Sequence, residues 1–593
     1  MLQISANLFL YRDTCNVYVV RSGREAVLID FGDGKVKDEL AEIGVEHITA
    51  ILMTHHHRDQ AQGLPKATGS PLYVPHSEQE LFHSADAFWQ ARAIYNNYDM
   101  RQDRFSLLQS VPITGTLLDY ETYTFGAHTF TIVPTPGHTL GSITLIAEID
   151  GQRVAFTGDL INAPGKVWSL AATQWTYNGA EGVAASIPSL IDLKNRQPQL
   201  LLPSHGEPMP EPEPAIDLLM QRLRELLDYR RENPRMYKFL AQPYDAVTPH
   251  LLWNRTSMSN AYVLLSESGK ALLIDYGYDF RTGESSGSDR SSRRPWLYTL
   301  PMLKRDYNVQ KIDVVLPTHY HDDHVAGLNL LRRVEGTQVW AAENFADILE
   351  HPAHYDLPCL WYDPITVDRR LPLEQTIQWE EYTFTLYPLP GHTLHAVAIA
   401  FEVDGKRVLV TGDQYQSNDL YNYVYKNRFR ISDYVQSAAL YRELVPNVIL
   451  TGHWDPYWVE PDYFDNLDER GKALERLHHE LLPLEVVDFG VEGVGVWISP
   501  YQSQIDVGES ITFDVEVLNP FGYTAKAVVR FIVPEGWKIQ NDEQTVQLAP
   551  HQVHTLKFRV TPTVPVRRAR VAVDLEIAGQ RFGQQAEALV TVT

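Results

Sequence analysis

The segment His319-Tyr320-His321-Asp322-Asp323-His324 directly follows the apolar run at 312–316. Three more donor residues come later in the chain, each where an apolar run ends in a turn: His392, Asp413 and His453. Imidazole and carboxylate groups are ligands that Zn²⁺ takes, and one tetrahedral zinc ion needs only four of them. Because strand ends on one face of a sheet can converge, we expect two metal ions bound by His319, His321, Asp323, His324, His392, Asp413 and His453.

The same pattern occurs twice, with a period of roughly 250 residues that makes each copy a domain. The first copy has a strand ending in Asp30, a His-rich loop at 55–60, Gly-His at 137–138, Gly-Asp at 158–159 and a strand-terminal His205. The second copy repeats these blocks in the same order, at Asp275, 319–324, 391–392, 412–413 and His453. Apolar strands alternate with amphipathic helices in both copies, which predicts α/β layering.

The repeat sets the expected domain boundaries: a first copy over 1–235, a second over 240–485 and a different domain over 490–593. Each copy closes with leucines at helical spacing, from 216 to 227 and from 474 to 481. The Pro-containing segment 235–247 is the expected linker. The second copy is longer between Asp275 and His319, and its extra segment 281–295, rich in Ser, Gly and Arg, predicts a mobile surface loop.

The character of the chain changes after about Val486. Apolar and polar residues alternate over 511–517, 556–560 and 571–577, and turns such as 519–522 and 534–537 separate these runs. Several short strands without a helix predict an immunoglobulin-like β-sandwich. Segment 533–537 also resembles a bacterial accessory domain found beside sugar-processing enzymes, a type that more often serves packing or dimerisation than carbohydrate binding.

The composition restricts the classes of function. The net charge of −24 is the wrong sign for a protein that neutralises phosphates, so we expect no nucleic acid partner. Cys15 and Cys359 provide neither a disulfide framework nor a cysteine metal site. The N-terminus does not read as a signal peptide, and no apolar run approaches the ~20 residues of a membrane span. We therefore expect a cytoplasmic protein without membrane contact, and leave open whether it forms a homo-oligomer.

The second-copy motifs resemble those of the metallo-β-lactamase superfamily: a His-x-His-x-Asp-His loop, then Gly-His, Gly-Asp and a strand-terminal His. The resemblance covers nearly all of each copy and implies two tandem αββα domains, followed here by the all-β immunoglobulin-like sandwich. It further implies that His319, His321 and His392 hold one metal, that Asp323, His324 and His453 hold the other, and that Asp413 bridges them.

Two cations lower the pKa of a bridging water, position the resulting hydroxide and stabilise a developing oxyanion. The expected function is thus zinc-dependent hydrolysis of an ester-like bond in a small molecule, with Asp323 and Asp413 as catalytic residues. Asp323 would both ligate the metal and orient the attacking oxygen. The superfamily includes thioesterases, lactonases, β-lactamases, sulfatases, phosphodiesterases and nucleases, so the fold does not identify the substrate.

The first copy differs at one position, where Gln60 replaces the last His of the loop. A neutral amide is a weak zinc donor, which should weaken the second metal more than the first. This copy could therefore hold between zero and two metals. Its candidate ligands are His55, His57, Asp59, His138, Asp159 and His205.

Other functions remain open from the sequence. Some superfamily members oxidise sulfur substrates with one iron ion, which here would be bound by His55, His138 and Asp159. A non-catalytic scaffold would need neither metal site. A nuclease resembling tRNA-processing enzymes fits the tandem layout, but the acidic charge argues against it. The flavodiiron branch is disfavoured, because it carries Glu where His321 and His57 stand.

Several residues near the motifs have two readings. Tyr423, Tyr425, Lys426, Arg428 and Arg430 could hold an anionic group or form a solvated loop. Trp168, Trp175 and Tyr177 could line a pocket or the core. His395 could donate a proton, although packing is the better interpretation. Ordinary structural roles are expected for His56, His76, His83, His351 and His354.

Overall fold

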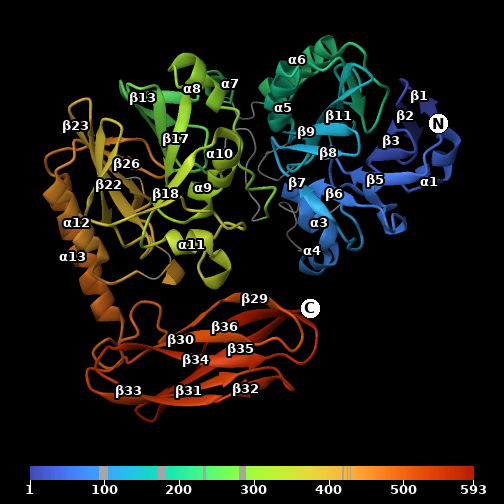
Figure 1. Ribbon diagram of the computed structural model, residues 1–593. Coiled ribbons are helices and arrows are strands. Elements are labelled where there is room, and N and C mark those ends of the chain that lie inside the picture. Colours follow the sequence, from blue (N-terminus) through green and yellow to red (C-terminus); the bar gives the residue numbers. More distant parts are fainter. Residues whose placement is uncertain are drawn as a thin grey trace.

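The computed structural model describes residues 1–92, 105–170, 182–230, 236–279, 289–416, 420–423, 425–427 and 429–593. Figure 1 shows two α/β bodies side by side, with an all-β body below them. The first α/β body along the chain holds the first sequence copy, and the second α/β body holds the second copy. Helix α13 (Tyr463–Leu481) closes the second copy beside the all-β body.

The first copy contains two sheets. One has the order β1-β2-β3-β4-β5-β6-β7 and the other the order β12-β11-β10-β9-β8. The strands of the first sheet are β1 (Leu2–Gln3), β2 (Leu8–Arg12), β3 (Asn16–Ser22), β4 (Glu25–Ile29), β5 (His47–Leu52), β6 (Leu72–Pro75) and β7 (Gly115–Leu117). Those of the second are β8 (Thr122–Phe125), β9 (His128–Pro134), β10 (Ile143–Ile149), β11 (Gln152–Gly158) and β12 (Leu200–Pro203).

The apolar residues of the strands fix the layering. In β3, Tyr18 and Val20 pack between the two sheets, whereas Val17 and Val19 pack on the opposite face with residues from the covering helices. Those helices are α1 (Val36–Glu39), α2 (Arg58–Ala61), α3 (Gln79–His83) and α4 (Ala85–Ala91). Burying each such side chain stabilises the fold by roughly 1.5–3 kcal/mol, and a one-residue slip in register would exchange the two faces.

Helices α5 (Val183–Asn195) and α6 (Pro212–Arg230) cover the outer face of the second sheet. Ile216, Leu219, Leu223 and Leu227 of α6 are buried there, as their spacing predicts. The expected linker 235–247 is partly structured: α7 (Met236–Ala241) buries Phe239, and β13 (Tyr244–Thr248) begins the next sheet. Aromatic and leucine side chains with a surface to pack on explain why this segment is ordered.

The second copy repeats this arrangement, with sheets ordered β13-β14-β15-β16-β17-β18-β19 and β20-β21-β22-β23-β26-β27. The first sheet comprises β13, β14 (Leu251–Asn254), β15 (Ala261–Leu265), β16 (Lys270–Ile274), β17 (Lys311–Leu316), β18 (Gln338–Ala342) and β19 (Arg369–Leu371). The second comprises β20 (Thr376–Trp379), β21 (Tyr382–Pro388), β22 (Val397–Val403), β23 (Lys406–Gly412), β26 (Val448–Thr451) and β27 (Tyr457–Trp458), with the ribbon β24 (Tyr415–Gln416) and β25 (Leu420–Tyr421) beside it.

The helices of the second copy are α8 (Leu300–Asp306), α9 (Asp322–Val325), α10 (Leu328–Glu335), α11 (Ala346–Glu350), α12 (Asp433–Leu444) and α13. The predicted apolar face of α13 is wrong at its C-terminal end, since Leu477 and Leu481 are exposed and His478 is buried. The helix buries Tyr463 and Leu467 instead, with α12 as its neighbour. Leucine spacing alone could not show that this end of the helix turns His478 inward, where its ring contacts Tyr423 and Phe429.

The C-terminal region is all-β and consists of two sheets, ordered β28-β30-β34-β32 and β29-β36-β35-β31-β33. Their strands are β28 (Val496–Ser499), β29 (Gln502–Ile505), β30 (Ile511–Leu518), β31 (Ala525–Ile532), β32 (Lys538–Gln540), β33 (Glu543–Leu548), β34 (Val553–Thr561), β35 (Val566–Ile577) and β36 (Gln580–Val592). Phe513, Phe531 and Phe558 pack in one core. The predicted fold class, two αββα copies followed by an all-β domain, is confirmed, while the immunoglobulin-like character of that domain stays a prediction.

The two cysteines are both free: Cys15 is buried and Cys359 is exposed. Across the described ranges, no helix combines the length and the apolar character needed to cross a membrane.

Candidate metal centres

The predicted donors of the second copy all lie just beyond strand ends, at one edge of the two sheets. His319 and His321 follow β17, His392 follows β21, Asp413 follows β23 and His453 follows β26. The structure gathers them into two groups that share Asp413, each with ligand atoms within 4.8 Å of one another. The groups are His319, His321, His392 and Asp413, and Asp323, His324, Asp413 and His453.

In the first of these groups, Nε2 of His392 lies 3.0 Å from Nδ1 of His321 and 3.6 Å from Oδ2 of Asp413. Nε2 of His319 is buried and forms no hydrogen bond with any described residue. A buried polar atom without a partner is rare, because it bears the full cost of desolvation. The residues therefore fit a metal ion, which would accept the lone pairs of these nitrogens.

The second group lies on the other side of Asp413. Nε2 of His324 is 3.2 Å from Oδ1 of Asp413, and Nε2 of His453 is 3.0 Å from Oδ2 of the same carboxylate. Oδ2 of Asp323 is 3.3 Å from Nε2 of His453. Asp413 thus offers one carboxylate to both groups, the arrangement expected of a bridging ligand.

The pKa shifts separate the two groups. Burial, followed by the fields of His324 and His321, holds the pKa of His319 well below its ordinary value, and burial lowers the pKa of His321 to about 3. Burial alone would lower the pKa of His453 too, but Asp413 and Asp323 outweigh it and raise that pKa to about 10. The first group thus presents neutral imidazoles, whereas the second pairs imidazolium with carboxylate, so a cation bound there would displace protons.

A second layer of contacts orients the ligands. Asp275 accepts a hydrogen bond from the backbone N of Thr318 at 2.7 Å, and its Oδ2 lies 2.9 Å from Nδ1 of His324. Its φ of 59° is in the left-handed region, which Asp tolerates better than most residues. Further contacts join Nδ1 of His392 to Asn422 O (2.6 Å), Nδ1 of His453 to Met258 O (3.1 Å) and Nε2 of His321 to Asn427 Oδ1 (3.3 Å). Such partners fix ring orientation and raise ligand basicity.

Gly452 has no side chain, and this absence leaves room for Asp413 and His324 of the second group. A Cβ at this position would lie 1.8 Å from Oδ1 of Asp413 and 2.9 Å from Cε1 of His324. The corresponding residue of the first copy, one before His205, is Ser204. The two copies therefore differ at two corresponding positions. The second copy has His324 and Gly452 where the first copy has Gln60 and Ser204.

In the first copy, His55, His57 and His138 form one group with ligand atoms within 4.8 Å. Nε2 of His138 lies 2.9 Å from Nδ1 of His57, and Oδ2 of Asp159 is 3.4 Å from His138 Nε2 and 3.7 Å from His55 Nε2. Burial lowers the pKa of all three histidines, His55 and His57 by the larger margin. This arrangement suits a single metal ion.

The second position of the first copy is filled by protein. Nε2 of Gln60 donates to Oδ2 of Asp159 at 3.1 Å, and Oγ of Ser204 donates to Oδ2 of Asp30 at 2.6 Å. Asp275 is the counterpart of Asp30 in the second copy, and its carboxylate contacts His324 instead. His205 lies 2.8 Å from Asp159 and 3.3 Å from Asp59. Of the other predicted ligands, Asp159 therefore borders the three-histidine group and contacts His205, which in turn lies beside Asp59.

The Metallo-beta-lactamase superfamily model matches residues 10–205 and 254–453. The chain belongs to this superfamily. The resemblance drawn from the His-x-His-x-Asp-His loop is therefore confirmed, and both copies are members in their own right.

Among superfamily relatives, the chain is 24% identical to the Beta-lactamase-like protein 2 homolog of Drosophila melanogaster over 254 residues, 40% of this chain and 76% of that protein. It is 26% identical over 215 residues to the atrochrysone carboxyl ACP thioesterase of Aspergillus chevalieri, covering 35% of this chain and 57% of that one. The chain thus spans little more than half the length of the thioesterase. A solved metallo-beta-lactamase from Cronobacter sakazakii is 16% identical, with a TM-score of 0.31, over 40% of this chain and 94% of that one.

Several side chains with open roles can be placed. The ring of Trp168 stacks on that of His205 at 4.1 Å and is half exposed, so it forms a wall of the first-copy site. Lys426 forms an ion pair with Asp356 at 2.8 Å, and Tyr423 packs against Phe429. Trp175, Tyr177 and Arg428 lie outside the described residues, and Arg430 is exposed.

The histidines expected to be structural differ in their surroundings. Nδ1 of His56 lies 3.1 Å from Oε2 of the buried Glu78, and Nε2 of His76 lies 3.1 Å from Asp363 of the second copy. His83 contacts Ser84, His351 stacks on His354, and His395 packs edge-on against Tyr320. His395 lines a cavity between the second copy and the all-β domain.

Sequence reasoning missed the second layer of contacts. For Asp275 a signal existed, because a strand-terminal Asp recurs at the same place in both copies. Asn427 and the Met258 carbonyl carry no such signal, because Asn427 ends a single 3-10 turn, Tyr425–Asn427, and Met258 lies in a bend.

Proposed function

We propose that the second copy is a dinuclear zinc hydrolase that cleaves an ester-like bond of a small molecule. The observation that carries this proposal is the shared carboxylate of Asp413, which belongs to both donor groups. A structural zinc site needs four ligands and no bridge. Seven donors in two groups joined by one carboxylate instead favour a catalytic pair of ions.

The protein's own residues have distinct tasks. Zinc bound at both positions would supply Lewis acidity and a water of lowered pKa. His319, His321 and His392 would hold one ion, while Asp323, His324 and His453 would hold the other. The side chains of Asp323 and His453 are 15% and 27% exposed, whereas that of His324 is fully buried. Substrate would therefore approach over His453 and Asp323, and we assign Asp323 to orienting the attacking water.

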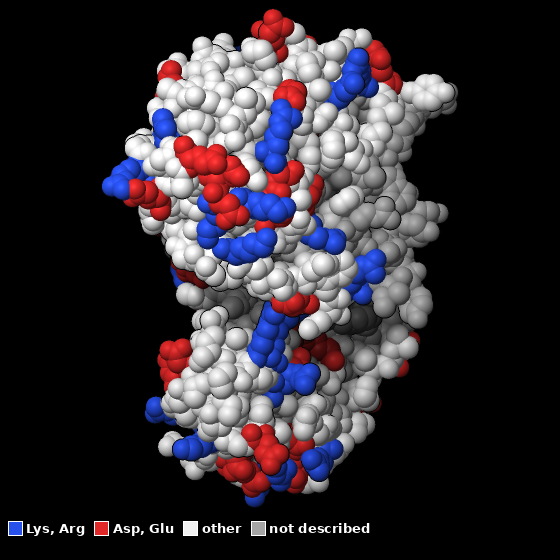
Figure 2. Space-filling model, turned by 90° about the vertical axis from the view of Figure 1, so that its right-hand side faces the viewer, with Lys and Arg blue, Asp and Glu red and all other residues white. Residues whose placement is uncertain are grey.

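The proposal names a class of bond rather than one substrate. The thioesterase of Aspergillus chevalieri supports a thioester or ester, although the match covers only part of that enzyme. A small molecule is favoured over nucleic acid by the net charge of −24. On the face shown in Figure 2, Lys and Arg side chains are interspersed with Asp and Glu rather than gathered in a basic patch.

The test combines metal quantitation with a panel of chromogenic esters, thioesters, lactones and phosphodiesters. Asp413→Ala and its counterpart Asp159→Ala form a matched pair. We expect Asp413→Ala to lower kcat/KM at least about a hundredfold, a loss of about 2.7 kcal/mol in transition-state stabilisation, and Asp159→Ala to leave it nearly unchanged. Full activity in Asp413→Ala, or no turnover of any substrate by zinc-loaded protein, would favour a non-catalytic scaffold.

The first copy supports a second candidate, a mononuclear iron oxidoreductase acting on a sulfur substrate. The observation that favours it is the approach of Asp159 to both His138 and His55, at 3.4 and 3.7 Å, while the second position is closed by Gln60. Iron near one equivalent, lost in His55→Ala but retained in His319→Ala, would support this function. Zinc alone in the first copy would exclude it.

A further inference from the structure

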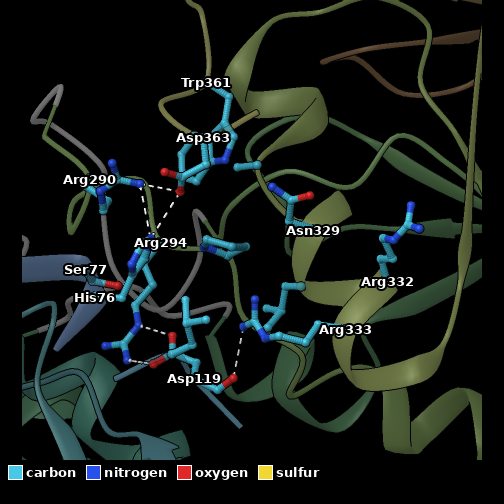
Figure 3. Close-up of a pocket in the computed structure, with 14 residues that line it drawn as sticks. His76, Ser77, Asp119, Arg290, Arg294, Asn329, Arg332, Arg333, Trp361 and Asp363 are labelled. Carbon is cyan, nitrogen blue, oxygen red and sulfur yellow. Dashed lines mark hydrogen bonds and ion pairs between the residues drawn. The ribbon is translucent and has the colours of Figure 1, made fainter. Parts of the chain in front are cut away.

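A segment of the second copy reaches into the first. Residues 289–295 belong to the insertion predicted to be a mobile surface loop, and for this described part the prediction is wrong: Ser291, Ser292 and Arg294 are buried. Residues 281–288 lie outside the described residues. Figure 3 shows this junction, with Arg294 pointing at Asp119 of the first copy and Arg333 directed toward the same residue.

Arg294 donates four hydrogen bonds from its guanidinium group to the first copy. Nε and Nη2 donate to the two carboxylate oxygens of Asp119 at 2.8 and 2.5 Å, and Nη1 donates to the carbonyls of Leu140 and Ser142 at 2.8 and 3.0 Å. The side chain is only 6% exposed. A buried cation needs a counter-ion and hydrogen-bond partners, and Asp119 with two carbonyls supplies partners for four of the five N–H donors of Arg294.

The two carbonyls belong to the turn that follows His138. Within this turn, the N of Thr139 donates to Oγ of Ser142 at 3.1 Å, and the N of Gly141 donates to Oε1 of Glu78 at 3.1 Å. The other oxygen of Glu78 accepts from the backbone N of His56 at 2.9 Å. Arg294 therefore anchors a turn that is bonded to both ligand-bearing segments of the first-copy site.

The second copy satisfies its equivalent turn internally. The carbonyl of Ala396, the counterpart of Ser142, accepts from the N of Leu389 at 3.0 Å, just as the Ser142 carbonyl accepts from the N of Thr135 at 3.0 Å. Its second donor is Nδ2 of Asn344 at 3.4 Å, a residue of the same copy, whereas the second donor to Ser142 is Arg294 of the other copy. The residue beside Arg294, Arg293, donates instead to Asp322, the neighbour of the ligand Asp323. Adjacent arginines of one segment thus contact the ligand loops of both copies.

We propose that Arg294, supplied by the second copy, is a positioning residue of the first copy's metal centre. The first site is then complete only in the tandem protein. Within the described ranges, no residue of the first copy donates a hydrogen bond to the Leu140 carbonyl, which accepts from Arg294 instead. The residues fit a metal there, because Nε2 of His55 is buried and forms no hydrogen bond with a described residue. The proposal concerns the first copy and does not depend on hydrolysis by the second.

The test uses the full-length chain with three variants. Arg294→Ala removes the contacts with Asp119 and the turn. Arg333→Ala is the matched control at the same junction, because Arg333 bonds Glu121 at 2.8 Å and the Asp119 carbonyl at 3.0 Å without touching the turn. Arg294→Lys keeps the charge opposite Asp119 but cannot make the fork and both carbonyl contacts together.

Two readouts are measured: hydrogen exchange of residues 136–145 in metal-free protein, and Co²⁺ affinity from its visible absorption. The second measurement uses a His319→Ala/His453→Ala background, so that the signal comes from the first copy. We expect Arg294→Ala to accelerate exchange in the turn and to weaken Co²⁺ binding by about 10–100-fold, with Arg333→Ala close to the parent. Arg294→Lys should recover the melting temperature but not the affinity.

Equal losses in Arg294→Ala and Arg333→Ala would show that the junction acts only through stability and would overturn the proposal. So would unchanged exchange and Co²⁺ affinity in Arg294→Ala. If Arg294→Ala does not fold, Arg294→Lys decides alone: parental affinity in that variant would also refute a positioning role.

Discussion

Oδ2 of Asp275 lies 2.9 Å from Nδ1 of His324, and this contact has no equivalent in the first copy. There Asp30 keeps the same left-handed backbone, with φ 58°, and the same contact with the next loop through Thr54, but its Oδ2 accepts from Ser204. One strand-terminal carboxylate therefore orients a metal ligand in one copy and a serine in the other. This difference distinguishes a complete second metal position from a closed one.

Asp275→Asn should weaken metal binding at the second position. The amide removes the negative charge that makes His324 more basic and fixes its ring, and outer partners of this kind are typically worth about 10–100-fold in metal affinity. Isothermal titration of metal-free protein measures the effect. Asp30→Asn is the control, and an equal loss at the second copy's sites in both variants would contradict the assigned role of Asp275.

Gly452→Ser should remove one metal from the second copy. The added Cβ would meet Asp413 Oδ1 at 1.8 Å, so the carboxylate or the His324 ring must move. We expect metal content to fall by about one equivalent per chain and hydrolysis to fall with it, since the bridging arrangement is lost. Wild-type metal content in a folded Gly452→Ser variant would show that the second position tolerates the side chain.

The reverse exchange should open the first copy. Gln60→His supplies the missing ligand, but Ser204 occupies the space that Gly452 leaves free, so the single variant should gain no metal. The double variant Gln60→His/Ser204→Gly should bind one additional equivalent, measured by elemental analysis after dialysis. If Gln60→His alone gains that equivalent, the contact between Ser204 and Asp30 is not what closes the site.

Much of the fold and the convergence of the donor side chains could be predicted because both depend on regular patterns. Candidate ligands such as His392 and Asp413 stand just after strands, and the order of the blocks repeats between copies, so spacing indicated which side chains converge. The role of Gly452 could not be predicted in this way. Its exchange with Ser204 is visible in the sequence, but the reason is a clash with Asp413 that only coordinates reveal.

The insertion shows where composition misleads. Ser, Gly and Arg are typical of exposed loops, yet Arg294 is buried because its counter-ion, Asp119, lies 175 positions earlier in the chain. A long-range pairing of this kind leaves no local pattern. Asn427 escaped prediction for a related reason, since its contact with His321 spans 106 positions.

Asp433, the first residue of α12, should make stability depend on pH. Burial raises its pKa to about 6. The hydrogen bond that it accepts from the N of Arg430 at 2.5 Å lowers the pKa, but by less than burial raises it. Because the folded-state pKa lies above the unfolded value, the native state holds more protons between about pH 4 and 6, and stability falls as pH rises through that window.

The Asp433→Asn side chain stays neutral, so this variant does not lose stability as pH rises. Its melting temperature relative to wild type should therefore increase from pH 4 to pH 7. The free-energy change behind it should be roughly 1–3 kcal/mol. A difference in melting temperature that stays constant with pH would mean that Asp433 is ionised throughout, and that the α12 terminus compensates its charge.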